Sequence, residues 1–262
     1  MLAPLLVTVL LLSPGQGDAL SRARQAYNAQ RFDEAISLAA EARGIERVAQ
    51  SAALVFARAS LERFRLAGDV ADIATARQAL LTIDPGRLTP SEASEFRLGT
   101  AELLFVDEQF GAATEIFETS LIKVPDSHRE RVLDWWASAL DRHAQLAPDG
   151  ERQRRYGRLL NGIEKELSVR PSSTVAMYWL AAAARGVEDL DRAWSVAVAG
   201  WIQAPALAEG QRGANLRTDL DRLMRDAIIP ERAKRAGPPA DPEALKVALA
   251  AEWESIKQRW TR

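Results

Sequence analysis

Cysteine is absent from the 262-residue sequence, and histidine occurs only twice, as His128 and His143. A chain without thiols forms no disulfide, offers no thiolate nucleophile or cysteine-ligated zinc, and has no cysteine to carry a lipid anchor. Motifs of the HExxH, P-loop, GxGxxG and GxSxG types are also missing. We therefore predict a protein that is not an enzyme and that holds no metal and no cofactor.

Helix breakers and strand-favouring patterns are scarce as well. The chain has 12 Pro and 15 Gly, and the strict apolar–polar alternation of a half-buried strand is limited to short stretches such as residues 57–62. Ala, Leu and Arg recur throughout, and these residues lose little side-chain freedom on a helix. Because 47% of the residues are hydrophobic and 27% are charged, the chain has enough apolar side chains for a core. The sequence predicts an all-α fold.

Charge of either sign is not in excess. The chain has 34 Lys and Arg against 36 Asp and Glu, a net charge of −2. This balance gives no reason to expect a phosphate backbone or an anionic membrane as the main partner. The most basic stretch, residues 151–158, begins with Glu151 and follows Asp149. We interpret it as a solvated helix face and expect no nucleic-acid partner.

Residues 2–12 form the one long apolar run, LAPLLVTVLLL, and a Pro-Gly pair and small residues follow it. This pattern is typical of a secretory signal, although no Lys or Arg precedes the run. Cleavage after Gly17 or after Ala19 satisfies the small-x-small rule, and the run is short for a bilayer span. The alternative is a buried first helix. We expect residues 1–19 to be a signal peptide, a periplasmic or secreted protein, and no stable membrane insertion after cleavage.

Prolines divide the rest of the chain at regular intervals. Pro85, Pro125, Pro171 and Pro205 each follow an amphipathic stretch, with spacings of 40, 46 and 34 residues (125−85, 171−125, 205−171). Periods in this range are typical of α-solenoids, in which each helix pair buries its apolar stripe on its neighbours.

One segment has a spacing pattern of its own. Residues at offsets of 9, 12, 16 and 24 from a small residue are an aromatic, an alanine, a second aromatic and a proline: Ala101, Phe110, Ala113, Phe117 and Pro125. This pattern resembles the tetratricopeptide-repeat consensus, with Thr100-Ala101 in place of Leu-Gly and Leu104 in place of a tyrosine. Small residues at these offsets let two helices approach, and the proline ends the pair.

Two further segments match more weakly. The same offsets give Ala181, Leu190, Ala193, Ala197 and Pro205 in one segment, and Ala23, Phe32, Ala35 and Ala39 in the other, where Gly44 is the expected stop. The resemblance covers about residues 19–44 and 94–205. It implies a right-handed α-solenoid of antiparallel helix pairs over residues 20–205.

Residues 206–262 differ from the repeats. We expect a helix over 215–229 that Pro230 breaks, a linker near 230–240, and a last helix opened by Asp241-Pro242-Glu243. The last helix carries an apolar stripe at helical spacing, Leu245, Leu249, Trp253, Ile256 and Trp260. It is either a cap on the solenoid, our preferred interpretation, or a detachable helix that docks on a partner.

Several local features have structural explanations. We interpret residues 188–191 as an interhelix loop, and Asp219 and Asp221 as pointing to different sides of one helix, since neither site has the spacing of a calcium loop. His128 is expected to be exposed. We expect His143, near a helix C-terminus, to be favoured as imidazolium. Adjacent Trp135 and Trp136 face different ways on a helix, so one of them is a candidate for partner contact.

In tetratricopeptide proteins the first helix of each pair lines a concave surface that binds peptides or helices. The resemblance implies the following partner-binding residues: Arg24, Tyr27, Asn28, Glu102, Phe105, Tyr178 and Arg185. Asn28 matches a family position that clamps the ligand backbone. We predict a non-enzymatic protein–protein interaction scaffold of the bacterial cell envelope. The alternatives are a helical envelope enzyme that acts on glycan through a buried Glu, and a structural subunit of an envelope complex.

Overall fold

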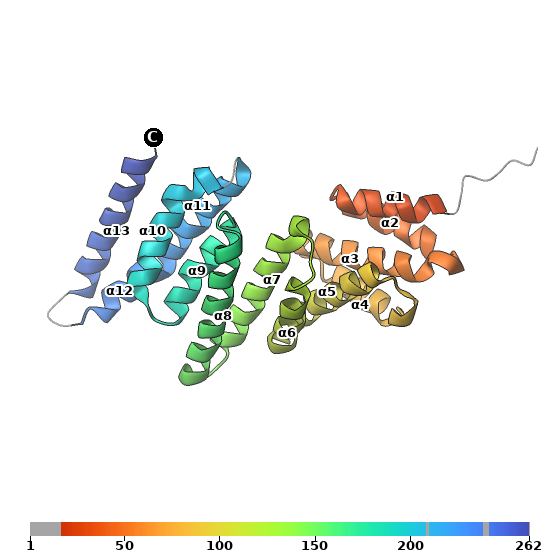
Figure 1. The fold of residues 1–262 in the computed structure, drawn as a ribbon, viewed down its shortest axis with the longest axis horizontal. Coiled ribbons are helices and arrows are strands. Elements are labelled where there is room, and N and C mark those ends of the chain that lie inside the picture. The colour runs from red at the N-terminus through yellow and green to blue at the C-terminus, as the bar shows by residue number, and fades with distance from the viewer. Residues whose placement is uncertain (1–16, 208–209, 238–240, 262) are drawn as a thin grey trace, which may run out of the picture. The chain divides into compact units, whose positions relative to one another are not determined.

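The computed structural model describes residues 17–207, 210–237 and 241–261, and every regular element in these ranges is a helix (Figure 1). The predicted all-α fold is confirmed. The apolar run of the predicted signal segment falls in residues 1–16, outside the described ranges. Contacts divide the chain into two compact units, residues 1–108 and 109–262, a division that the sequence did not indicate.

Residues 17–108 of the first unit contain five α-helices that pack in chain order, with short 3-10 turns at Glu46–Val48 and Pro85–Arg87. The central helix α3 contacts both of its chain neighbours α2 and α4 and also α1 and α5, so that α1, α3 and α5 lie next to one another. The α-helices are α1 (Gly17–Asn28), α2 (Phe32–Arg43), α3 (Ala49–Ala67), α4 (Val70–Leu81) and α5 (Pro90–Val106).

Local sequence signals fix the helix ends of this unit. Helix α3 ends at Gly68, whose φ of +73° is the left-handed conformation that glycine adopts at low cost. The Asp69 side chain then accepts a hydrogen bond from Ala71 N at 2.9 Å and starts α4. Thr89 and Glu92 form a capping box at the start of α5, with Pro90 in the first turn.

Small residues lie where α1 and α2 cross. The alanines at the predicted repeat positions, Ala23, Ala35 and Ala39, have no exposed surface, and Phe32 is 9% exposed. An alanine at a crossing lets two helix axes approach closely, and the neighbouring aromatic ring fills the remaining space. The small and aromatic residues at the predicted offsets are therefore buried between α1 and α2.

The second unit begins with α6 and again packs its helices in chain order, and α9 also contacts α7 and α11. The clearest predicted pair, α5 with α6, thus has one helix in each unit. The elements are α6 (Phe110–Leu121), α7 (Asp126–Gln145), α8 (Asp149–Val169), α9 (Thr174–Gly186), α10 (Leu190–Leu207), α11 (Gln211–Leu223), a π-helical turn (Met224–Ile228), α12 (Ile229–Arg235) and α13 (Pro242–Trp260).

Pro205 does not end a helix, contrary to the expectation from its spacing. It lies inside α10, which continues to Leu207. A proline has no N–H for the carbonyl four residues earlier, which here belongs to Trp201. Arg217 of α11 satisfies that carbonyl instead, with Nε donating to Trp201 O at 3.1 Å and the guanidinium 4.2 Å from the Trp201 ring centroid. A tertiary contact therefore compensates for the proline.

Pro230 likewise does not break the chain into a linker, so the predicted linker near 230–240 is wrong over Ile229–Arg235, which is helix α12. The preceding turn is π-helical, and Ile229 N–H bonds to Met224 O, five residues back. Such a turn shifts the hydrogen-bond register just before Pro230. The proline then lies in the first turn of α12, where a missing N–H costs little. Residues 238–240 lie outside the described ranges.

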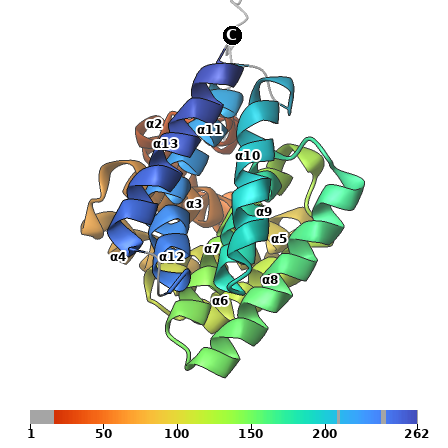
Figure 2. The same ribbon diagram turned by 90° about the vertical axis from the view of Figure 1, so that its left-hand side faces the viewer.

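Helix α13 packs on α12 and α10 (Figure 2). Trp253 has no exposed surface, and its ring meets Trp201 and Trp194 edge to face at centroid distances of 5.8 and 6.5 Å. Its Nε1 donates to Asp221 Oδ1 at 2.8 Å. Leu249 and Ile256 are buried, whereas Trp260, at the end of the stripe, is 55% exposed. The stripe is thus docked on its own chain over most of its length.

Trp253→Ala should destabilise the second unit by about 3–5 kcal/mol, because it leaves a large cavity and removes one hydrogen bond to the Asp221 carboxylate. Trp260→Ala on the same helix is the matched control and should change the free energy of unfolding by less than about 0.5 kcal/mol. Urea unfolding followed by far-ultraviolet circular dichroism measures both. Equal effects of the two substitutions would contradict the observed docking of α13.

The docking of α13 should weaken in acid. Burial raises the pKa of Asp221, but hydrogen bonds from Lys257 (2.6 Å) and Trp253 outweigh it, so this pKa lies below its usual value of 3.8. A carboxyl whose pKa is lowered by folding stabilises the fold above its unfolded pKa and loses that contribution as pH falls through the folded value. Wild type should therefore lose more stability than Asp221→Asn between about pH 5 and pH 2. Parallel urea-unfolding curves for the two proteins over this range would refute the assignment.

Candidate functional site

Side chains of α1, α3 and α5 meet on one side of the first unit. Arg24 of α1 reaches Glu92 of α5 at 2.5 Å, and Arg58 of α3 donates to the Tyr27 hydroxyl at 3.3 Å. Burial raises the pKa of Glu92, but hydrogen bonds from Ser51 and Thr89 and the charge of Arg24 outweigh it, and the pKa lies below its usual range. The structure thus connects Arg24 and Tyr27, both predicted from the sequence, to a common surface.

Glu102 takes a different place from the one that the resemblance implied. Its carboxylate lies 2.6 Å from Arg58 Nη1, and both side chains are only 5% exposed. Burial alone lowers the pKa of Arg58, but the charge of Glu102 and the Tyr27 hydroxyl outweigh it and hold that pKa above its usual value. Glu102 therefore neutralises buried Arg58 and is not accessible to a binding partner. Arg58 itself was not singled out in the sequence.

Two predicted residues of this unit remain partly accessible. Asn28 is exposed and lies four residues after Arg24, so the two side chains share one face of α1. Phe105, near the end of α5, is half-buried. The accessible part of the predicted set in this unit consists of Arg24, whose side chain is 48% exposed, with Asn28 and the edges of Tyr27 and Phe105.

In the second unit, Tyr178 and Arg185 lie seven residues apart on one face of α9. Arg185 binds Glu231 of α12 through Nε at 2.9 Å and through Nη2 at 2.5 Å. Burial raises the pKa of Tyr178, and the nearby charges of Asp219 and Asp141 add to it. The two predicted residues therefore lie near α7, α11 and α12 together. Asp221 meets α13 instead, which confirms that Asp219 and Asp221 point to different sides.

A buried carboxylate with a raised pKa is the feature that would favour an enzyme, and Asp141 has such a pKa. Burial raises it, while the Tyr156 hydroxyl works in the opposite direction. Both Asp141 oxygens are occupied, one by Tyr156 Oη at 2.7 Å and the other by Gln145 Nε2 at 2.7 Å. Since its acceptor sites are held by neighbours, the carboxyl is arranged to fix Tyr156 rather than to exchange a proton with a substrate.

Next to Tyr156 lies a cavity of about 620 Å³ that sequence reasoning missed. Its walls come from the end of α7, the start of α8, the α9–α10 turn and α12. It is lined by Gln145, Arg152, Tyr156, Arg185, Gly186, Glu188, Leu190, Glu231, Lys234 and Arg235. Arg185 is the one predicted partner-binding residue in the lining.

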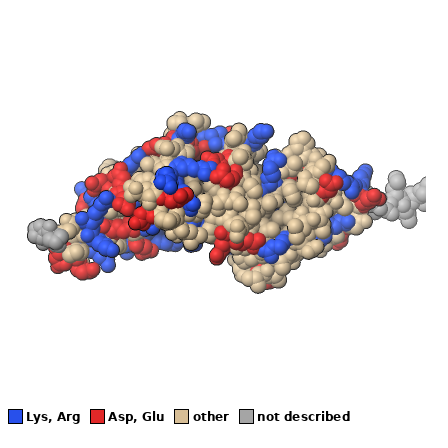
Figure 3. Space-filling model, turned by 90° about the horizontal axis from the view of Figure 1, so that it is seen from below, with Lys and Arg blue, Asp and Glu red and all other residues tan. Residues whose placement is uncertain are grey.

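The basic stretch over 151–158 is more fully paired than the expected solvated face. Arg155 binds Glu151 at 2.9 Å, and Arg158 binds Glu115 at 2.7 Å and also Glu118. Tyr156 in the same stretch is buried. On the face drawn in Figure 3, Lys and Arg are interspersed with Asp and Glu. This arrangement does not resemble a nucleic-acid footprint.

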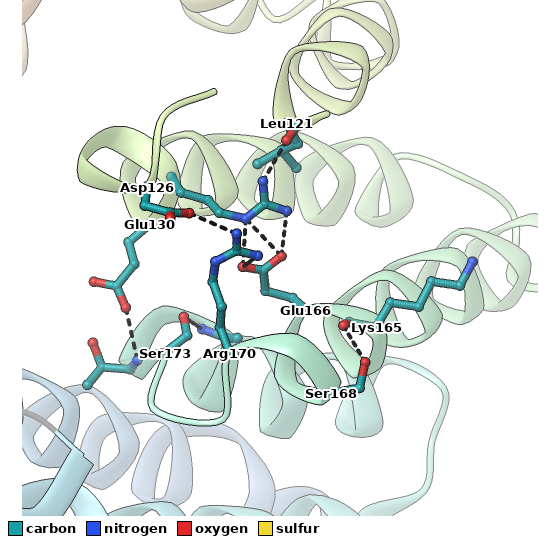
Figure 4. Close-up of polar contacts among 11 residues, drawn as sticks. Leu121, Asp126, Glu130, Lys165, Glu166, Ser168, Arg170 and Ser173 are labelled. Carbon is teal, nitrogen blue, oxygen red and sulfur yellow. Dashed lines mark hydrogen bonds and ion pairs between the residues drawn. The ribbon is translucent and has the colours of Figure 1, made fainter. Parts of the chain in front are cut away.

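A second ion-pair group joins α6, α7 and α8 (Figure 4). Arg129 binds Glu166 at 2.7 Å with one nitrogen and donates to Leu121 O at 2.6 Å with another. Arg170 connects Glu166 to Asp126, 2.8 Å away. The group satisfies a carbonyl at the end of α6 and fixes α7 on α8, which is a structural role.

The two histidines do not form a site. His128 is exposed, as expected. His143 lies near the C-terminus of α7, but its pKa is lowered rather than raised, because burial and the charge of Arg155 outweigh Glu151 and Glu115. The expected preference for imidazolium is therefore wrong. Arg155 also donates to His143 O, so the guanidinium takes the helix-end position that the imidazolium was expected to use.

Trp135 and Trp136 face different ways, as predicted. Trp136 is 2% exposed, whereas Trp135 is half-buried and stacks on Phe117 at a centroid distance of 5.9 Å. In residues 17–207, 210–237 and 241–261, no group of three or more His, Asp or Glu side chains is placed to hold a metal ion. No helix within those same limits combines the length and apolar character that a membrane crossing requires.

The chain matches no protein-family model, and neither a curated protein nor a solved structure is significantly similar to it.

The buried pair can be tested by a double-mutant cycle. Glu102→Leu should destabilise the first unit by about 3–5 kcal/mol, because it leaves Arg58 charged and buried without its partner. Adding Arg58→Met should recover most of that loss, since an apolar pair of similar volume needs no counter-charge. Urea unfolding of the wild type, the two single variants and the double variant gives the coupling energy. A double variant as unstable as the sum of the single ones would show that the pair is not coupled.

Proposed function

We propose that the protein is a non-enzymatic interaction scaffold of the bacterial cell envelope, with a right-handed, tetratricopeptide-like solenoid arrangement. It binds a protein or peptide partner through the odd-numbered helices of each unit. One observation carries this proposal: α1, α3 and α5 lie next to one another in the first unit, and α9 lies next to α7 and α11 in the second. In a stack of helix pairs the first helices adjoin in this way and form one continuous inner layer.

The polar groups on these helices support binding rather than catalysis. Arg24 forms an ion pair with Glu92, and Arg185 forms one with Glu231. Each guanidinium is therefore held in place by a carboxylate of another helix. Side chains that are already ordered lose less entropy when a partner binds. Tyr27 and Tyr178 are partly exposed, and a tyrosine side chain, with its apolar ring and polar hydroxyl, is suited to contact with a peptide.

Export is the second part of the proposal, and it rests on the signal-like residues 1–19. Leu20, the residue after the later predicted cleavage point, is 8% exposed and belongs to the core of α1 and α2. Cleavage at either predicted point would leave that core residue in place. Cleavage after Ala19 would remove the first three residues of α1, including Ala19, which packs against the same core. A mature chain that is cleaved after Gly17 would therefore retain the packing of its first helix pair.

Site-specific photocrosslinking in the native envelope tests the binding surface. A photoreactive phenylalanine analogue at Asn28 of α1 and one at Tyr178 of α9 should each give a discrete adduct with a partner protein. Analogues at exposed Gln78 of α4 and Asn161 of α8, on even-numbered helices, are the matched controls and should not. Adducts that form from the controls and not from Asn28 or Tyr178 would overturn the proposed surface.

A further inference from the structure

The cavity beside Tyr156 adjoins a second hollow of similar size. The second one also measures about 620 Å³ and lies between the α9–α10 turn, α12 and α13. Three residues, Glu188, Leu190 and Arg235, line both cavities. Arg235 donates to Glu188 O at the junction. The two cavities therefore adjoin within the second unit, and we call them together the composite groove.

The two halves of this groove differ in charge. The first is lined by four cations, Arg152, Arg185, Lys234 and Arg235, against two carboxylates, Glu188 and Glu231, a local excess of +2 (4 − 2). The whole chain carries −2, so this excess is a local departure from the balance of the sequence. Lys234 is exposed and forms no ion pair among the described residues.

Arg185, one of the cations of the first half, is held in place by a carboxylate. Arg185 uses Nε and Nη2 to bind Glu231, which fixes the guanidinium and leaves Nη1 for another acceptor. Tyr156 also lines this half, and its hydroxyl donates to Asp141 Oδ1 at 2.7 Å. A Cβ on residue 186 would lie 2.2 Å from Tyr156 Cδ1, so Gly186 is required for the ring to lie there. A guanidinium that is fixed in this way is well placed to bind the carboxylate of a ligand.

The second half combines charged residues that have partners on the protein with a set of apolar residues. Arg232 binds Asp191 at 2.6 Å and stacks over the Trp194 ring, and Asp189 accepts from Arg192 N. The apolar lining consists of Val187, Leu190, Ala236, Leu245 and Leu249. Removing apolar surface of a ligand from water in such a hollow is favourable.

From this juxtaposition we propose that the groove binds an extended peptide segment in which an acidic residue lies close to a large aliphatic residue. The carboxylate binds Arg185 and Lys234, and the aliphatic side chain enters the hollow beside Leu245 and Leu249. This inference rests on the proposed protein-binding function and names the chemistry of one bound segment. The choice of a peptide over a small anion follows from the adjoining apolar half, which an inorganic anion leaves empty.

Fluorescence anisotropy on the full chain tests the proposal. The probe is a labelled pool of octapeptides with one fixed Asp and one fixed Leu, one to three residues apart, in a Gly and Ser background. Matched pools replace the Asp by Asn or the Leu by Ser. The Asp–Leu pool should bind about tenfold more tightly than either matched pool, and its binding should weaken as salt rises.

Variants locate the binding. Lys234→Glu should weaken the Asp–Leu pool about tenfold and leave the Asn pool unchanged. Lys246→Glu, at an exposed α13 position outside both cavities, is the matched control and should have no effect. Leu245→Ala should reduce the affinity for the Asp–Leu pool and not for the pool with Ser. Circular dichroism of each variant shows whether the helices remain folded.

Three outcomes would overturn the inference. The first is equal binding of the Asp and Asn pools, and the second is an Asp–Leu affinity that Lys234→Glu leaves unchanged. The third is displacement of the Asp–Leu pool by inorganic phosphate at concentrations similar to the dissociation constant of the peptide. The last would assign the cations to a small anion. If the crosslinks from Asn28 and Tyr178 persist while the peptide pools fail, this groove is refuted and the proposed binding surface is not.

Discussion

Close approach of helices through alanine is the constraint on which the rest of the structure depends. Ala23 and Ala35 in the first unit, and Ala181 and Ala193 in the second, lie at helix crossings and have no exposed surface. Such crossings bury little apolar area each, so a helix pair gains stability only by stacking on further helices. Large rings then fill the gaps that alanines leave, as Trp253 does between α10 and α13. Any larger residue at a crossing would move two helices apart, and with them every side chain that bridges to the next pair.

Bridging side chains are the second level of organisation. Arg58 lies between α1 and α5 because α3 lies between those helices, and it is satisfied by Tyr27 and Glu102 together. Glu231 and Arg185 likewise join α12 to α9, although this pair is partly exposed. A buried charge is costly unless its partner is fixed, so these bridges tie the spacing of the helices to the position of the charged groups. The surface that we assign to partner binding is consequently a product of the packing, and its residues are ordered before a partner arrives.

Local chemistry in the sequence predicted much of the helix layout. The helix ends at Gly68, Asp69 and the Thr89–Glu92 box are decided by backbone conformation and hydrogen bonds within a few residues, which is the range over which local sequence signals act. The candidate site was less accessible to such reasoning. The place of Glu102 depends on Arg58, which is 44 residues earlier in the chain (102−58) and carries no repeat signal. The division after Glu108 depends on how many contacts cross that point, which no local pattern records.

The misplaced linker and the missed groove have one physical origin. The sequence indicated that Pro230 ends a helix, and a linker over 230–240 would leave Glu231, Lys234 and Arg235 without fixed positions. The π-helical turn over Met224–Ile228 instead carries the helix through the proline. One extra residue in a turn rotates the next helical segment by about 100° relative to an uninterrupted helix. That rotation sets which side chains of α12 face α9, where Glu231 meets Arg185. The turn that hides the helix from sequence analysis is therefore also the element that orients one wall of the groove.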